Sequence, residues 1–179
     1  TPAHLDLGRL TSSFMADNQG LSMQEFIEQA CASIIGTDTV MHDPRDVVVY
    51  GFGRIGRLVT RLLVEKTGGG HNLVPRAVVL RSPKDPIKDL NRRASLLRRD
   101  SIHGNFKGTI RVDEENGVLV CNGNVIRFIY SGDPASIDYT EYGINNAMVI
   151  DSSGAWRDEQ GLSQHLQSKG VSKVLLTTS

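Results

Sequence analysis

The feature that most constrains the fold is a glycine-rich turn between an apolar run and an amphipathic segment. Residues 47–50 read Val-Val-Val-Tyr, and residues 51–56, Gly-Phe-Gly-Arg-Ile-Gly, follow directly. A short apolar, β-branched run is typical of a parallel strand that is buried on both faces. Residues 55–66 place apolar side chains on one side and cations on the other, which predicts a helix. With a second apolar run at 77–80, the segment predicts a right-handed strand–helix–strand unit.

The rest of this region continues the alternation of strands and helices. Helices are expected at 86–98 and 156–169, and strands at 108–112, 118–121, 125–130, 147–151 and 174–177. Asn122-Gly123 lies between two of these strands and is a strong signal for a hairpin turn. The pattern predicts an α/β fold, namely a Rossmann-type doubly wound, mainly parallel sheet with an antiparallel hairpin insertion and an N-terminal helical extension.

The N-terminal part has a different pattern. Ser22 and Glu25 form a capping-box signature at the start of a helix. The apolar stripe of this helix consists of Met23, Phe26, Ile27, Ala30, Cys31 and Ile34, and Gly36 is expected to end it. The stripe must pack on the following domain or on a partner chain. We therefore expect a helical extension and linker over 1–44 and a main domain over 45–179.

Composition excludes several classes of partner. The 179 residues include 20 Lys or Arg and 20 Asp or Glu, so the formal net charge is zero. This balance argues against binding of nucleic acid or anionic lipid through the overall charge of the chain. Two cysteines, Cys31 and Cys121, match no zinc spacing and no disulfide framework, which indicates a reducing compartment. No secretory signal and no membrane-spanning run are visible. We expect a cytoplasmic protein without a metal, a membrane or a nucleic-acid partner.

The turn has the G-x-G-x-x-G spacing of a dinucleotide-binding site. Gly51 permits a tight turn, Gly53 lets the backbone approach a pyrophosphate, and Gly56 allows close contact between helix and strand. The N-terminus of the following helix offers free N–H groups and the positive end of its dipole. The spacing and its context therefore predict binding of a nicotinamide dinucleotide.

The residues after the second strand bear on the choice between NAD and NADP. An acidic residue normally binds the ribose 2′-hydroxyl about 20 residues beyond the turn. This chain has Arg81 and Ser82 there instead. A cation and a hydroxyl suit a 2′-phosphate, which favours NADP or the use of both cofactors. In the alternative, Arg81 is merely exposed and NAD binds less selectively.

Several motifs in order resemble the phosphorylating glyceraldehyde-3-phosphate dehydrogenases. Residues 50–57 resemble the family's N-G-F-G-R-I-G-R, residues 100–104 its D-S-x-H-G, and residues 152–154 its S-T-G. The match extends from about Asp46 to the last residue, and Tyr50 and Arg81 replace the family's usual Asn and Asp. The chain is thus similar to the N-terminal NAD(P)-binding domain of a longer bacterial variant with an N-terminal extension. The resemblance implies that the side chain of His103 fixes its loop by hydrogen bonding.

The resemblance also implies which residues hold the cofactor. Ser153 and Gly154 are expected to pass under it, and Thr177 to lie near the nicotinamide end. The full set of expected cofactor-binding residues is Gly51, Phe52, Gly53, Arg54, Ile55, Gly56, Arg81, Ser82, Ser153, Gly154 and Thr177.

No catalytic residue is assigned. The family's catalytic Cys, in S-C-T-T-N-C, and its catalytic His match no position here, and Cys31 and Cys121 are interpreted as inert packing groups. The resemblance implies that the catalytic domain is missing, so the fragment alone is inactive. The full-length enzyme would be a homo-oligomer, a tetramer in this family, that converts the aldehyde to 1,3-bisphosphoglycerate with NAD(P) reduction in glycolysis or gluconeogenesis. The alternative is a non-catalytic nucleotide-binding or protein-interaction module.

Overall fold

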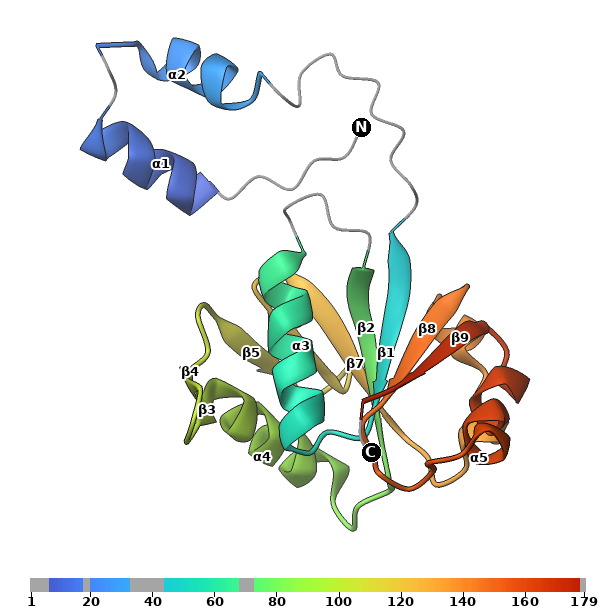
Figure 1. Ribbon diagram of the computed structural model, residues 1–179. Helices are drawn as coiled ribbons and strands as arrows, with labels where there is room; N and C mark the ends of the chain where they lie inside the picture. Colours follow the sequence, from blue (N-terminus) through green and yellow to red (C-terminus); the bar gives the residue numbers. More distant parts are fainter. Residues whose placement is uncertain (1–6, 18–19, 33–43, 68–72, 178–179) are drawn as a thin grey trace.

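The computed structural model describes residues 7–17, 20–32, 44–67 and 73–177 and shows a twisted sheet with helices on both faces (Figure 1). The first half contains α1 (Leu7–Ala16), α2 (Met23–Ala30), β1 (Arg45–Tyr50), α3 (Arg54–Lys66), β2 (Leu73–Leu80), α4 (Pro86–Arg98), β3 (Arg99–Asp100) and β4 (Gly104–Asn105). The second half contains β5 (Ile110–Asp113), β6 (Val118–Cys121), β7 (Asn124–Tyr130), η1 (Pro134–Ser136), η2 (Tyr139–Tyr142), β8 (Ala147–Asp151), α5 (Glu159–Ser163), η3 (Gln164–Gln167) and β9 (Val171–Leu176).

The sheet has the strand order β5-β6-β7-β2-β1-β8-β9. The strands from β7 to β9 in this order are parallel, while β6 and β5 are antiparallel additions at one edge. Asn122 and Gly123, with φ of 47° and 83°, form the tight turn between β6 and β7. The predicted doubly wound sheet with a hairpin insertion is confirmed. Because the strand order reverses between β1 and β8, a crevice is expected at their carboxyl ends.

Two hydrophobic cores cover the faces of the sheet. In Figure 1, α3 and α4 lie on one face, where Val49 and Val78 pack against side chains such as Leu90. Segments after β7 and β8 cover the other face, where Tyr139 packs with Val79. The central strands are buried on both faces, which explains why their sequences are continuous apolar runs and not alternating ones.

The region after β8 differs from the predicted single helix over 156–169. The helix α5 begins at Glu159, because the Asp158 carboxylate caps it by accepting the Gly161 N–H at 2.7 Å. Trp156 therefore precedes the helix, and its ring packs edge-on against Tyr50 with centroids 5.5 Å apart. The next strand also begins earlier than expected, at Val171. Apolar spacing does not locate a cap, so the prediction placed the helix start too early.

The N-terminal segment contains two short helices. The Ser22–Glu25 capping box is present at α2, as predicted. Phe26 of its apolar stripe packs against Phe14 of α1, with ring centroids 5.3 Å apart. Ile34 and Gly36 lie outside the described residues. The division between 1–44 and 45–179 stays a prediction.

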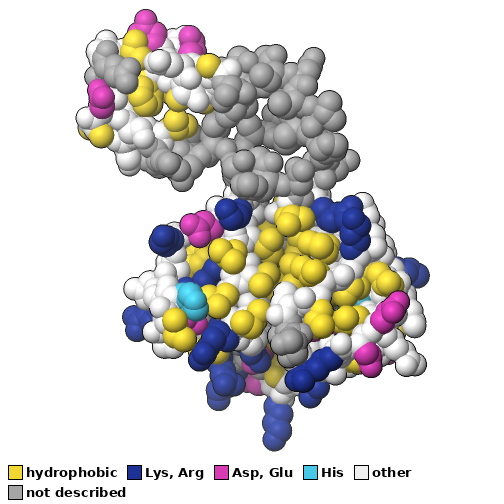
Figure 2. Space-filling model, in the orientation of Figure 1, with side chains coloured by type: hydrophobic (Ala, Val, Ile, Leu, Met, Phe, Trp, Pro, Cys, Tyr) yellow, Lys and Arg dark blue, Asp and Glu magenta, His cyan; other side chains and the backbone are white. Residues whose placement is uncertain are grey.

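Exposed hydrophobic side chains gather on one face of the sheet and its helices (Figure 2). Ile55 and Leu62 of α3 and Leu175 of β9 are among the large hydrophobic residues that are exposed. Within the described ranges, no helix has the length and apolar character that crossing a bilayer requires.

Candidate dinucleotide-binding site

The predicted site residues meet at the carboxyl edge of the parallel strands. The first residue beyond each of four strands donates its N–H to a carbonyl of the neighbouring strand. These bonds are Gly51 to Val79 at 2.9 Å, Ser131 to Leu80 at 2.8 Å, Ser152 to Tyr50 at 2.8 Å and Thr177 to Asp151 at 3.0 Å. The chain therefore leaves each strand at a defined position, which brings the residue 51–56 turn and the loops after β8 and β9 to one edge of the sheet.

The absence of a side chain has a different structural explanation at each of the three glycines of the turn. Gly51 has φ +89°, and a Cβ on it would come within 2.8 Å of the Ser153 backbone. A Cβ on Gly56 would overlap the carbonyl oxygen of Gly51. Around Gly53, in contrast, no atom of the described residues, apart from its own and those of its two chain neighbours, lies within 4 Å of the Cβ position. Packing of the chain explains Gly51 and Gly56, but the open space at Gly53 is what close approach of a ligand requires.

The N-terminus of α3 is suited to an anion. Gly53 is its N-cap and supplies no side-chain cap, and its first turn carries no acidic residue. The first N–H groups of a helix lack partners within the helix, and together with the dipole they favour a phosphate. The guanidinium groups of Arg57 and Arg93 donate to the Phe52 carbonyl at 3.4 and 3.3 Å, which places two cations beside the turn. The turn therefore fits a pyrophosphate.

Phe52 contributes to the turn in a way that the motif does not reveal. Its side chain is 1% exposed and packs against Phe128 with ring centroids 5.4 Å apart. Only the backbone of Phe52 is thus available to a cofactor. The side chain of Ile55, in the first turn of α3, is 40% exposed to solvent.

Arg81 and Ser82 follow β2 at the same edge, and both are exposed. Burial raises the pKa of Tyr50 to about 12, with further increases from Asp151 and Asp133, and the nearby positive charge of Arg81 opposes this rise. Among the described residues, no side-chain hydrogen bond or ion pair engages Arg81. The guanidinium is therefore free to meet a ligand phosphate.

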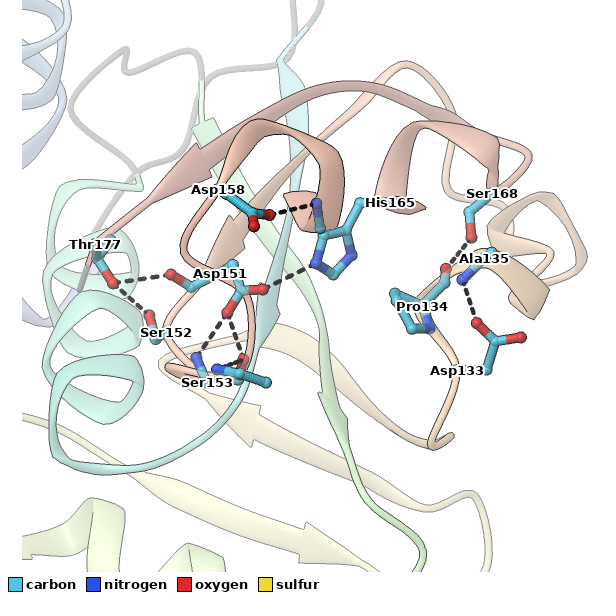
Figure 3. Close-up of polar contacts among 12 residues, drawn as sticks. Asp133, Pro134, Ala135, Asp151, Ser152, Ser153, Asp158, His165, Ser168 and Thr177 are labelled. Atoms are coloured by element: carbon cyan, nitrogen blue, oxygen red, sulfur yellow. Dashed lines mark hydrogen bonds and ion pairs between the residues drawn. The ribbon is translucent and has the colours of Figure 1, made fainter. Parts of the chain in front are cut away.

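The loops after β8 and β9 are joined by hydrogen bonds (Figure 3), and we call them one wall of the expected crevice, with the residue 51–56 turn as the other. Ser152 Oγ and Thr177 Oγ are 2.9 Å apart, and the Thr177 hydroxyl also donates to the Asp151 carbonyl at 3.1 Å. One carboxylate oxygen of Asp151 accepts both the N–H and the hydroxyl of Ser153, each at 2.7 Å. Gly154 follows with φ +70°. These bonds hold the loop in place opposite Gly51.

The sequence interpretation missed two residues behind this wall, Asp151 and His165. Asp151 Oδ2 lies 2.9 Å from His165 Nε2, and both side chains are fully buried. Burial tends to raise the pKa of Asp151, but hydrogen bonds from His165 and Ser153 outweigh it and hold the pKa below its usual value. A carboxylate that ends a buried strand was the available signal. Its partner comes 14 residues later and is not recognisable from spacing.

His103 and the two cysteines lie outside the residues of the crevice. His103 Nδ1 lies 3.0 Å from Asp100 Oδ1, which also accepts the N–H groups of Ile102 and His103, so His103 helps to fix its loop. Cys31 and Cys121 are both buried, and burial raises the pKa of Cys121 to about 12. A protonated, inaccessible thiol is a packing group and not a nucleophile.

The fold and the glycine-rich turn at the switch in strand order together define a dinucleotide-binding protein of the Rossmann class. The profile described as "Glyceraldehyde 3-phosphate dehydrogenase, NAD binding domain" matches residues 45–159. The chain belongs to this family and contains its NAD-binding domain.

Individual relatives agree with this assignment. A "Glyceraldehyde-3-phosphate dehydrogenase-like protein" of Pseudomonas aeruginosa (strain UCBPP-PA14) is 53% identical over 176 residues, which is 98% of this chain and 38% of that protein. The glyceraldehyde-3-phosphate dehydrogenase of Neurospora crassa is 37% identical over 131 residues, 73% of this chain and 35% of its own length. Glyceraldehyde-3-phosphate dehydrogenase 2 of Drosophila melanogaster is 36% identical over 129 residues, 72% of this chain and 34% of its own length. The chain thus spans little more than a third of these relatives.

Proposed function

We propose that the chain binds a nicotinamide dinucleotide in the crevice between the residue 51–56 turn and the residue 152–154 loop. The observation that carries this proposal is the open space at Gly53, beside the uncapped N-terminus of α3. Gly51, Gly53, Arg54 and Ile55 would line the pyrophosphate. Ser153 and Gly154 would pass under the cofactor, and Thr177 would lie near the nicotinamide, which accepts a hydride when bound.

Within a longer protein, the role of this part would be to hold and orient the cofactor of a phosphorylating glyceraldehyde-3-phosphate dehydrogenase. Family membership supports that activity. The chain by itself would not oxidise an aldehyde, because both of its thiols are buried. These free thiols also support a cytoplasmic location, and assembly into a homotetramer rests on the family alone.

The site would either prefer NADP or bind NADP and NAD alike; it would not be specific for NAD. Arg81 and Ser82 are exposed directly after β2, the strand whose end normally presents the residue that meets the adenosine ribose. A guanidinium there would pair with a 2′-phosphate by charge-assisted hydrogen bonds.

Calorimetric titration of the 179-residue chain with NAD and NADP tests the proposal, with Gly53→Ala as the decisive variant. We expect saturable binding to the native chain and at least tenfold weaker binding to Gly53→Ala, since a methyl group would occupy the space that a pyrophosphate needs. The urea midpoint of Gly53→Ala should equal that of the native chain, because none of the residues that the structure describes opposes the added Cβ. Lack of binding by the native chain at millimolar cofactor, or equal binding by the folded variant, would overturn the proposal.

A further inference from the structure

A buried contact between a carboxylate and an imidazole lies directly behind the crevice wall. Asp151 is the last residue of β8, the strand that neighbours β1 at the switch in strand order. Its two carboxylate oxygens face different partners: Oδ1 accepts from Ser153, and Oδ2 meets Nε2 of His165 (Figure 3). The carboxylate thus connects Ser153 of the crevice loop with His165 of η3.

His165 is held for this contact by its surroundings. Its ring is fully buried and packs edge-on against Tyr50, with centroids 4.7 Å apart, and against Trp156, with centroids 5.6 Å apart. Within the described structure, Nδ1 has no hydrogen-bond partner. Since an ionised carboxylate only accepts, the contact requires the proton on Nε2. The Nε2–H donor of the imidazole is therefore directed at Asp151.

The loop that Asp151 holds is in tight contact with the glycine-rich turn. A Cβ on Gly51 would come within 2.8 Å of both Cα and N of Ser153, so turn and loop leave no room for displacement toward each other. A displacement of Ser153 away from the turn is opposed by the two bonds to Asp151 Oδ1. The relation between the two walls of the crevice thus depends on where the Asp151 carboxylate is held.

We propose that His165 is a positioning residue for the cofactor site, which acts through Asp151 to hold residues 153–154 against the glycine-rich turn. This inference rests on the proposed function, that the crevice binds a nicotinamide dinucleotide. Within the described structure, the ring nitrogens of His165 make no hydrogen bond to Gly51 or Ser153, since Nε2 meets Asp151 and Nδ1 has no partner. The imidazole keeps the carboxylate in the rotamer that engages Ser153, and loss of its donor leaves a buried carboxylate oxygen without a partner.

Two amide variants of the full 179-residue chain separate positioning from packing. The side-chain nitrogen of His165→Gln reaches the position of Nε2 and keeps a donor to Asp151, whereas that of His165→Asn ends near Nδ1 and does not reach it. At a temperature where both variants are folded, we expect NAD(P) affinity within about threefold of native for His165→Gln and roughly tenfold weaker for His165→Asn. Equal affinities in both variants, native or reduced, would overturn the positioning role.

Amide hydrogen exchange at Ser153 without cofactor gives an independent measurement. The Ser153 N–H should exchange at least tenfold faster in His165→Asn than in His165→Gln, while amides in the central strands keep comparable protection. If His165→Asn does not fold, His165→Leu, which also lacks a donor to Asp151, replaces it, and its Ser153 N–H should likewise exchange faster than that of His165→Gln. Unchanged exchange contradicts the inference. If the native chain binds no dinucleotide, the proposed function fails, and exchange at Ser153 still decides whether His165 positions the loop.

Discussion

Gly56 in the first turn of α3 lies directly against the backbone of Gly51, so that a Cβ on Gly56 would overlap the Gly51 carbonyl oxygen. It would also come within 3.3 Å of a methyl group of Val49 in β1. This contact sets how closely the helix approaches the strand at the start of the site.

Gly56→Ala should therefore destabilise the fold by about 1–3 kcal/mol, because helix and strand must move apart to accommodate the methyl group. The free energy of unfolding in urea, followed by the fluorescence of the single tryptophan, Trp156, measures this loss. Gly53→Ala is the matched control, since it adds the same methyl group to the same turn in open space. Equal free energies of unfolding for the two variants would show that the close contact is unimportant.

Arg81→Ala should weaken NADP binding by about 1.5–3 kcal/mol, or roughly 10–150-fold, and leave NAD affinity within about threefold of native. The reason is that only NADP offers a 2′-phosphate to the exposed guanidinium. Paired calorimetric titrations measure the two affinities. Lys66→Ala, which removes a cation from the last turn of α3, controls for general electrostatic attraction. A similar loss of affinity for NAD and NADP would show that Arg81 contacts the pyrophosphate or acts only through long-range electrostatic attraction, and not on the 2′-phosphate.

Cys121 should be unreactive in the folded chain. Its side chain is fully buried and its pKa is raised to about 12, so only about one thiol in ten thousand is ionised at pH 8. In Cys31→Ala, which retains Cys121 alone, we expect the native protein to react with a thiol reagent at least a hundredfold more slowly than the urea-unfolded chain. A native rate close to the unfolded rate would contradict the burial of this thiol.

The free energy of unfolding should depend on pH through the carboxyl group of Asp138. Hydrogen bonds from Thr140 and Lys169, including the Lys169 Nζ at 2.9 Å, lower the pKa of Asp138 to about 2. The unfolded chain has the ordinary value near 3.9. Because the folded pKa is the lower one, the contribution of Asp138 is complete above about pH 4 and disappears as the pH falls toward about 2.

Urea unfolding of native protein and Asp138→Asn at several pH values between 6 and 2 tests this dependence. The stability difference between the two proteins should be constant above about pH 4.5 and shrink toward pH 2. Glu141→Gln, which alters another acid of the same turn, should show no comparable convergence. A difference that stays constant down to pH 2 would contradict the lowered pKa.

Much of the fold was predictable because its signals are local. A buried strand, the residue 51–56 turn and an amphipathic helix follow one another within about twenty residues, and each has its own pattern of side chains. The capping box of Ser22 and the Asn122-Gly123 turn are equally local, because each depends on neighbouring residues. The helix after β8 was placed wrongly, since its beginning depends on the cap at Asp158 and not on apolar spacing.

By itself, the sequence determined the glycine spacing, the sheet class and the cation after β2, because backbone propensity and periodicity are properties of short segments. Only the tertiary structure decided that Phe52 lies in the core, that Gly51 abuts Ser153, and that His165 meets Asp151. These relations depend on β8 lying beside β1, although about a hundred residues separate the two strands in the chain. Burial then removes competing water, so that the bonds of Asp151 can define the shape of the crevice.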